Sequence, residues 1–226
     1  MRLPMVYRKS MLTYFARLAI VFLTVLALFI ISSVFGLLTG ASLRESFSGF
    51  GDDFLNTFIP LAYIWFGFYY LWVPYREFKL GMQNGQTRHQ IWLSQILGII
   101  TTTIFNFLLW LAAGGWHYQT ITPYFGTFLI LIDVVSLAYA VGSGFALLSR
   151  KWKIIVGIAT PTVILIVLVQ IVRLLINFWH PSAATLQALS SLVDWSGSWV
   201  LCGLLWLAIM IGLSYLFTMR QQLRRD

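Results

Sequence analysis

Charged residues are scarce in this chain. Asp, Glu, Lys and Arg make up 10% of its 226 residues, and apolar residues make up 59%. A soluble domain carries about 25% charged residues, because its surface must face water. So few charges cannot cover a water-exposed globule of this length. The composition therefore predicts that most of the chain lies in a lipid bilayer.

The sequence also lacks the common motifs of enzymes and ATP-binding proteins. It has no G-x-x-x-x-G-K-[ST] phosphate loop, no H-E-x-x-H zinc motif and no G-x-S-x-G elbow. His89, His117 and His180 fall in three different predicted loops and are interpreted as solvated or interfacial. Cys202 is the single cysteine, which excludes an intrachain disulfide. We expect no catalytic residues, no metal and no cofactor in this chain.

What the sequence does contain is a series of long apolar stretches. A helix needs roughly 20 apolar residues to cross the hydrocarbon core of a bilayer. The predicted spans cover residues 18–39, 57–74, 91–112, 124–148, 154–178 and 197–218. The first is longer than the core of a signal peptide and is interpreted as an uncleaved span. The prediction is an all-α, polytopic membrane protein with one transmembrane domain over residues 1–226.

The basic residues indicate how this domain is oriented. If the N-terminus is cytoplasmic, all fifteen Lys and Arg residues except Arg44 and Arg173 fall in cytoplasmic segments. Because cytoplasmic loops carry an excess of Lys and Arg, both termini are predicted to be cytoplasmic, in a cell membrane. Anionic lipid is a sufficient partner for the net charge of +8, so no nucleic acid is needed to explain it.

The predicted cytoplasmic segment between the second and third spans is the most informative loop. Tyr75, Phe78 and Met82 have the spacing of one helical stripe. Asn84-Gly85 is suited to ending that helix in a left-handed turn, and Thr87 to capping the next one. Periodicity leaves two interpretations open. The helix lies either in the lipid headgroups or in a groove of a cytoplasmic partner.

This segment resembles the coupling helix of the permease subunits of type-two ABC transporters, the exporter class. The resemblance rests on the stretch 76–88, with its aromatic residue Phe78, its Asn84-Gly85 turn and Thr87-Arg88 before the third span. It implies a coupling helix at about 75–85, an N-terminal amphipathic interfacial helix at 3–16, and an outside loop at 180–196. The residues it implies for contact with the ATPase are Tyr75, Arg76, Phe78, Lys79, Met82, Asn84, Gly85 and Arg88.

Several residues inside the predicted spans also carry expectations. Two stripes of small residues on the fourth span, 136/140/144 and 138/142/146, predict close approach of another helix. Pro161 predicts a kink in the fifth span. The intramembrane polar residues are expected in a structural network or a substrate path, and comprise Asp133, Gln170, Arg173 and Asn177. Because an unpaired intramembrane charge is costly, Asp133 and Arg173 are predicted to pair.

Together these features favour the membrane-spanning permease subunit of an ATP-driven ABC exporter. ATP hydrolysis is expected in a separate ATPase chain, and the translocation path at the interface with a second permease subunit of the same or a related chain. Two alternatives stay open: a substrate-binding membrane subunit of an ATP-driven importer, and a non-transporting membrane protein such as an immunity or assembly factor. No inverted repeat is visible, which disfavours a secondary transporter.

Overall fold

The computed structural model describes residues 5–39, 50–113, 121–178, 185, 187, 190–191 and 196–222, and all structural statements below concern these residues. Their main elements are the helices α1 (Met5–Leu38), α3 (Phe50–Gln83), α4 (Arg88–Ala112), α5 (Thr122–Leu147), α6 (Arg150–Phe178) and α8 (Ser196–Arg220). Within the described part of the chain, six helices are long and apolar enough to cross a membrane. The prediction of an all-α chain with six helices of membrane-spanning length and composition is therefore confirmed.

Two helices extend far beyond the predicted spans. α1 runs without a break from Met5, and α3 continues through Pro60 and Pro74 to Gln83. Segment 5–16 and segment 75–83 are thus the ends of long helices, and the structure does not separate either one as a helix of its own. Composition marks where lipid gives way to water, but a helix continues across that boundary as long as its hydrogen bonds are made.

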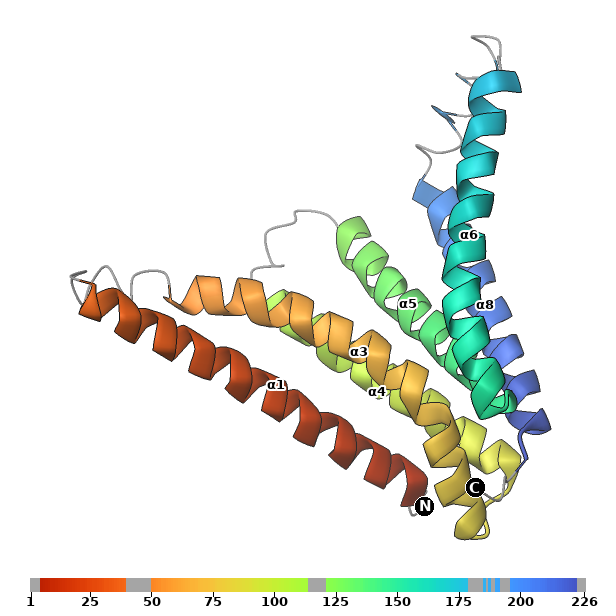
Figure 1. Cartoon of the computed structure of the whole chain (residues 1–226), viewed down its shortest axis with the longest axis horizontal. Helices are drawn as coiled ribbons and strands as arrows, with labels where there is room; N and C mark the ends of the chain where they lie inside the picture. Colours follow the sequence, from red (N-terminus) through yellow and green to blue (C-terminus); the bar gives the residue numbers. More distant parts are fainter. Residues whose placement is uncertain are drawn as a thin grey trace.

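All six helices have one end in a common region of the molecule. In Figure 1 the N-terminus of α1, the α3–α4 turn, the α5–α6 turn and the C-terminus of α8 gather at the lower right. Lys9, Arg76, Arg88, Lys151 and Arg220 belong to the helix ends that meet there. We call this region the basic end. The helices therefore run alternately away from it and back, as successive membrane spans must.

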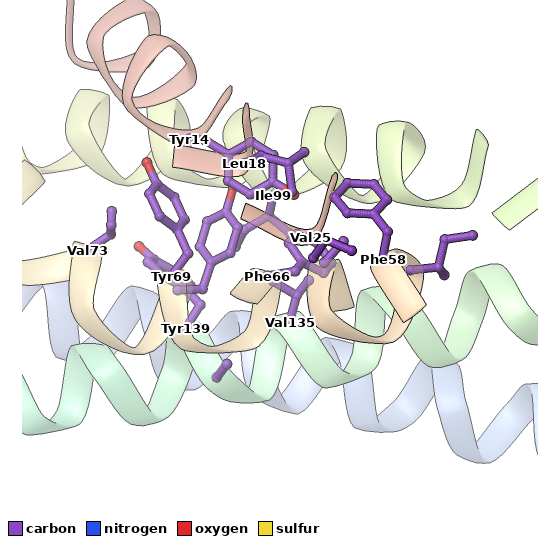
Figure 2. Close-up of a cluster of buried hydrophobic side chains, with 14 of the residues drawn as sticks. Tyr14, Leu18, Val25, Phe58, Phe66, Tyr69, Val73, Ile99, Val135 and Tyr139 are labelled. Atoms are coloured by element: carbon purple, nitrogen blue, oxygen red, sulfur yellow. The ribbon is translucent and has the colours of Figure 1, made fainter. Parts of the chain in front are cut away.

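α3 lies at the centre of the packed part of the molecule. It contacts α1, α4 and α5, and α5 in turn packs along α8. Figure 2 shows Phe66 and Tyr69 of α3 among side chains of the neighbouring helices, including Tyr14 of α1 and Tyr139 of α5. The Tyr14 and Tyr69 rings meet edge to face with centroids 5.1 Å apart. In lipid, such close packing is a main source of helix association.

The small residues of α5 bring two helices close to it, one on each stripe. A Cβ atom added to Gly142 would lie 2.5 Å from the Leu71 carbonyl oxygen, so the α5 backbone touches the α3 backbone there. On the other stripe, Gly144 faces the ring of Phe217 on α8, where an added Cβ would lie 3.3 Å from the nearest ring carbon. The predicted close packing of this span is confirmed, with a different partner for each stripe.

α6 is the least packed helix. Its apolar side chains are largely exposed, among them Ile158, Leu165 and Leu174. An apolar groove of about 1010 Å³ separates its middle turns, between residues 156 and 168, from α3 and α5. Pro161 lies within this continuous helix, and a kink there stays a prediction. A large apolar face of the chain is thus available to lipid or to another protein.

Candidate functional site at the basic end

The turn between α3 and α4 is built as the sequence predicts. The Gln86 amide donates to the Gly81 carbonyl at 3.0 Å, and the Gly85 amide donates to the Met82 carbonyl at 3.1 Å. This pair of bonds is a Schellman motif. Gly85 has φ 73°, a left-handed conformation that glycine adopts without a steric penalty. The predicted left-handed stop is therefore confirmed.

α4 then begins with a reciprocal cap. The Gln90 amide donates to the Thr87 hydroxyl at 3.3 Å, and the Thr87 amide donates to the Gln90 side-chain oxygen at 3.0 Å. Thr87 is thus the N-cap of this helix, as predicted, and the two bonds form a capping box. A Cβ atom on Gly81 would lie 2.5 Å from the Ile91 side chain, so the two helices are in close contact just behind the turn. The α3–α4 hairpin (residues 75–92) is therefore a tightly constrained unit.

The residues predicted to contact an ATPase are not all exposed on this hairpin. Phe78 is completely buried within the chain itself, with an exposed fraction of 0%. Tyr75 and Met82 are half-buried, as is Lys79. The ammonium of Lys153 lies 5.3 Å from the centre of the Tyr75 ring. The apolar stripe at 75, 78 and 82 therefore packs largely against this chain.

The outer surface of the hairpin is polar. Arg76, Asn84, Gly85 and Arg88 are exposed, and so is Gln83 beside the turn. Asn84 also donates from its side-chain amide to the Leu80 carbonyl at 2.6 Å, which fixes its orientation. The structure thus divides the predicted contact residues into a covered apolar group and an exposed polar group. A partner that approaches the basic end meets the polar group.

The hairpin is attached to the end of α8. The Arg88 guanidinium donates to the Met219 carbonyl, and the Trp92 indole donates to the Ser214 hydroxyl at 3.3 Å. The Trp92 ring also meets the Tyr215 ring edge to face at 5.1 Å. α8 in turn packs along α5, so the hairpin is connected through α8 to a second helix.

Behind the hairpin lies a polar network that the sequence analysis did not predict. Gln95 donates to the Pro74 carbonyl at 3.2 Å and accepts from the hydroxyl of Tyr139. Further along α4, Thr102 is bonded to Tyr70 at 2.8 Å. Gln95, Thr102 and Asn106 are all buried and lie on one face of α4. Their spacing of seven and four residues was the available sequence signal, although it does not identify the partner helices.

The intramembrane polar residues singled out from the sequence are not brought together. Asp133 faces α8, where one of its carboxylate oxygens would lie 3.2 Å from a Cβ atom on Gly203. Gln170, Arg173 and Asn177 lie on α6 with exposed side chains. Among the described residues, the other Asp133 oxygen, Oδ1, has no hydrogen-bond partner.

The predicted Asp133–Arg173 pair is therefore wrong for this structure. The prediction assumed that α5 and α6 pack together because a short turn connects them. In fact α8 lies closely along α5, and α6 is packed extensively against none of the described helices. Arg173 is left on the exposed surface of α6, where its charge can reach the lipid headgroups.

Within the described ranges, no three His, Cys, Asp or Glu side chains lie close enough to hold a metal ion. Comparisons with protein-family models, with curated proteins and with solved structures find no match for this chain.

Proposed function

We propose that this chain is the membrane-spanning permease subunit of an ATP-driven ABC exporter. In this proposal the basic end is cytoplasmic, both termini lie there, and a separate ATPase subunit docks on the α3–α4 hairpin. The chain supplies the helices that line the translocation path and contributes no catalytic residue. The segment 75–83, which continues α3, takes the role of the coupling helix.

The observation that carries the proposal is the construction of the hairpin. Its turn is held by a Schellman motif and a capping box, and it presents exposed polar residues at the basic end. It is also bonded to α8 through Arg88 and Trp92. A rigid unit with a polar outer surface and a direct connection to another membrane helix is suited to passing on movement from a cytoplasmic partner.

The weak packing of α6 supports a second permease subunit. Its apolar surface is largely exposed, and the groove of about 1010 Å³ beside it is lined by residues such as Phe68, Leu137 and Leu165. A second copy of this chain, or a related one, would cover part of this face. The translocation path would then lie between the two subunits.

Site-specific photo-crosslinking tests the ATPase contact. A photoreactive amino acid replaces Gln83, which is exposed beside the turn, or Leu38 as the control. Leu38 is 79% exposed and ends α1 on the side away from the basic end. Illumination of intact cells should attach an ATPase containing a phosphate loop to the Gln83 variant and not to the Leu38 variant. If neither or both positions capture such an ATPase, the hairpin is not its docking site.

A further inference from the structure

A cavity of about 200 Å³, lined mostly by polar and charged residues, lies between α1 and α3 at the basic end. α1 contributes Lys9, Ser10 and Thr13 to its walls, and α3 contributes Arg76 and Glu77, among others. The cavity lies beside the hairpin and does not depend on the function proposed above. Its walls combine one buried carboxylate with exposed basic side chains.

Glu77 is the residue that makes this cavity unusual. Its exposed fraction is 6%, and its Oε1 atom has no hydrogen-bond partner among the described residues. Ser10 and Gln95 lie within hydrogen-bonding reach of its carboxyl group. They are also bonded elsewhere, Ser10 to Tyr69 and Gln95 to the Pro74 carbonyl, and Oε1 remains without a partner. A buried carboxylate oxygen without a donor is costly, so a ligand that brings a donor to Oε1 would stabilise this arrangement.

The rim of the cavity has the opposite charge. Lys9 and Arg76 are exposed there. Each directly precedes a buried residue of the cavity wall, Ser10 and Glu77 respectively. Exposed ammonium and guanidinium groups bind phosphate oxygens. The cavity lies where the helices end, and the neighbouring Trp72 is 78% exposed, as expected for an indole at the headgroup level of a bilayer. The phosphate of a membrane lipid is therefore within reach of both basic side chains.

These features together define the ligand. We propose that the cavity binds the headgroup of an aminophospholipid, phosphatidylethanolamine, with its ammonium at Glu77 and its phosphate at Lys9 and Arg76. The ammonium supplies the N–H donor that the Oε1 atom of Glu77 lacks. The quaternary ammonium of phosphatidylcholine has no N–H to donate, and the headgroup of phosphatidylglycerol carries no positive charge. The site is thus selective for the primary amine.

Native mass spectrometry of the detergent-purified, full-length protein tests this selectivity. The protein is mixed with phosphatidylethanolamine, phosphatidylcholine or phosphatidylglycerol of identical acyl chains, and the bound lipid is counted. Retention of phosphatidylethanolamine should exceed that of phosphatidylcholine by about tenfold, as expected for a hydrogen bond to a charged group. Glu77→Gln should abolish this preference. Asp53→Asn, at an exposed acid near the other end of α3, is the matched control and should leave it unchanged.

A second variant guards against misfolding of Glu77→Gln. Lys9 is exposed, so Lys9→Gln should fold, and it should weaken retention of both phosphatidylethanolamine and phosphatidylcholine. Equal retention of these two lipids by the unaltered protein would overturn the proposal, and so would stronger retention of phosphatidylglycerol. A Glu77→Gln protein that is less stable but keeps the preference for phosphatidylethanolamine would show that Glu77 stabilises the fold and does not bind the lipid, which would also overturn the proposal. Soluble phosphoethanolamine that raises the melting temperature as much as the lipid does would overturn the lipid as the source.

Discussion

The Arg88 guanidinium donates a hydrogen bond to the backbone carbonyl of Met219, which joins the α3–α4 hairpin to the last turn of α8. The last carbonyls of a helix have no partner within it, and a positive charge beside them is favourable. The two residues are 131 positions apart in the sequence. A residue in the part of the chain that resembles a coupling helix is therefore bonded directly to the C-terminal span.

Removal of this bond should loosen the hairpin. We expect Arg88→Gln to lower the free energy of unfolding in detergent by about 1 kcal/mol, the usual net value of one hydrogen bond. Arg220→Gln is the matched control, because it removes an exposed positive charge from the same end of α8. Thermal unfolding of the two purified variants measures the difference. Equal melting temperatures would mean that Arg88 contributes only its positive charge and that its hydrogen bond does not hold the hairpin.

The close contact of α5 with α3 makes a second prediction. Gly142→Ala places a methyl group 2.5 Å from the Leu71 carbonyl oxygen, and a backbone atom cannot move aside cheaply. We expect a loss of about 1–3 kcal/mol of stability, as for other overpacked interiors. Gly126→Ala, in the same helix with no atom within 4 Å of the added methyl group, should be neutral. Similar stability of the two variants would contradict the backbone contact.

The sequence was sufficient where the determining interactions are local. Gly85 and Thr87 form their turn and cap with residues a few positions away, so their roles follow from residue type and spacing. The polar network is different, because the seven-residue spacing of Gln95 and Thr102 shows only that they share a helix face. Their partners on α3 and α5 are fixed by the packing of whole helices.

Connectivity misled the prediction for Asp133 and Arg173. A short turn places the ends of two helices near each other, but it does not require the two helices to pack along their lengths. Gly144 of α5 faces Phe217 of α8, which comes later in the sequence than α6, and α6 is left without close packing. The stripe in the sequence showed that a helix packs closely here, yet not which helix.

A double-mutant cycle tests the separation of these two charges. Asp133→Asn and Arg173→Gln should change the thermal stability independently, with the double variant equal to the sum within about 0.5 kcal/mol. Additivity is expected because Asp133 faces Gly203 of α8 and Arg173 is exposed on α6. If the double variant loses clearly less stability than the sum, the two side chains interact in the native protein, and α6 lies against α5.

The predicted orientation can be tested with single cysteines on a Cys202→Ala background. Ser46 lies between the first two predicted spans, on the side predicted to be outside, and is not among the described residues, whereas Gln86 lies in the α3–α4 turn. A cysteine at position 46 should react with an impermeant thiol reagent on intact cells, and one at position 86 only after lysis. The reverse pattern would place the basic end outside and remove the α3–α4 hairpin from reach of any cytoplasmic ATPase.

The burial of Phe78 decides which residues of the hairpin a partner can contact. Phe78 is completely covered by its own chain, while Phe68, ten residues earlier on α3, is 63% exposed. Phe78→Ala should leave a cavity and cost about 3–5 kcal/mol of stability, and Phe68→Ala should cost far less. Thermal unfolding in detergent measures both variants of the same helix. A Phe78→Ala protein of normal stability that no longer retains an ATPase would show that the ring enters the partner, as the apolar stripe in the sequence first suggested. Loss of stability with the ATPase still bound would instead assign docking to the exposed polar residues of the turn.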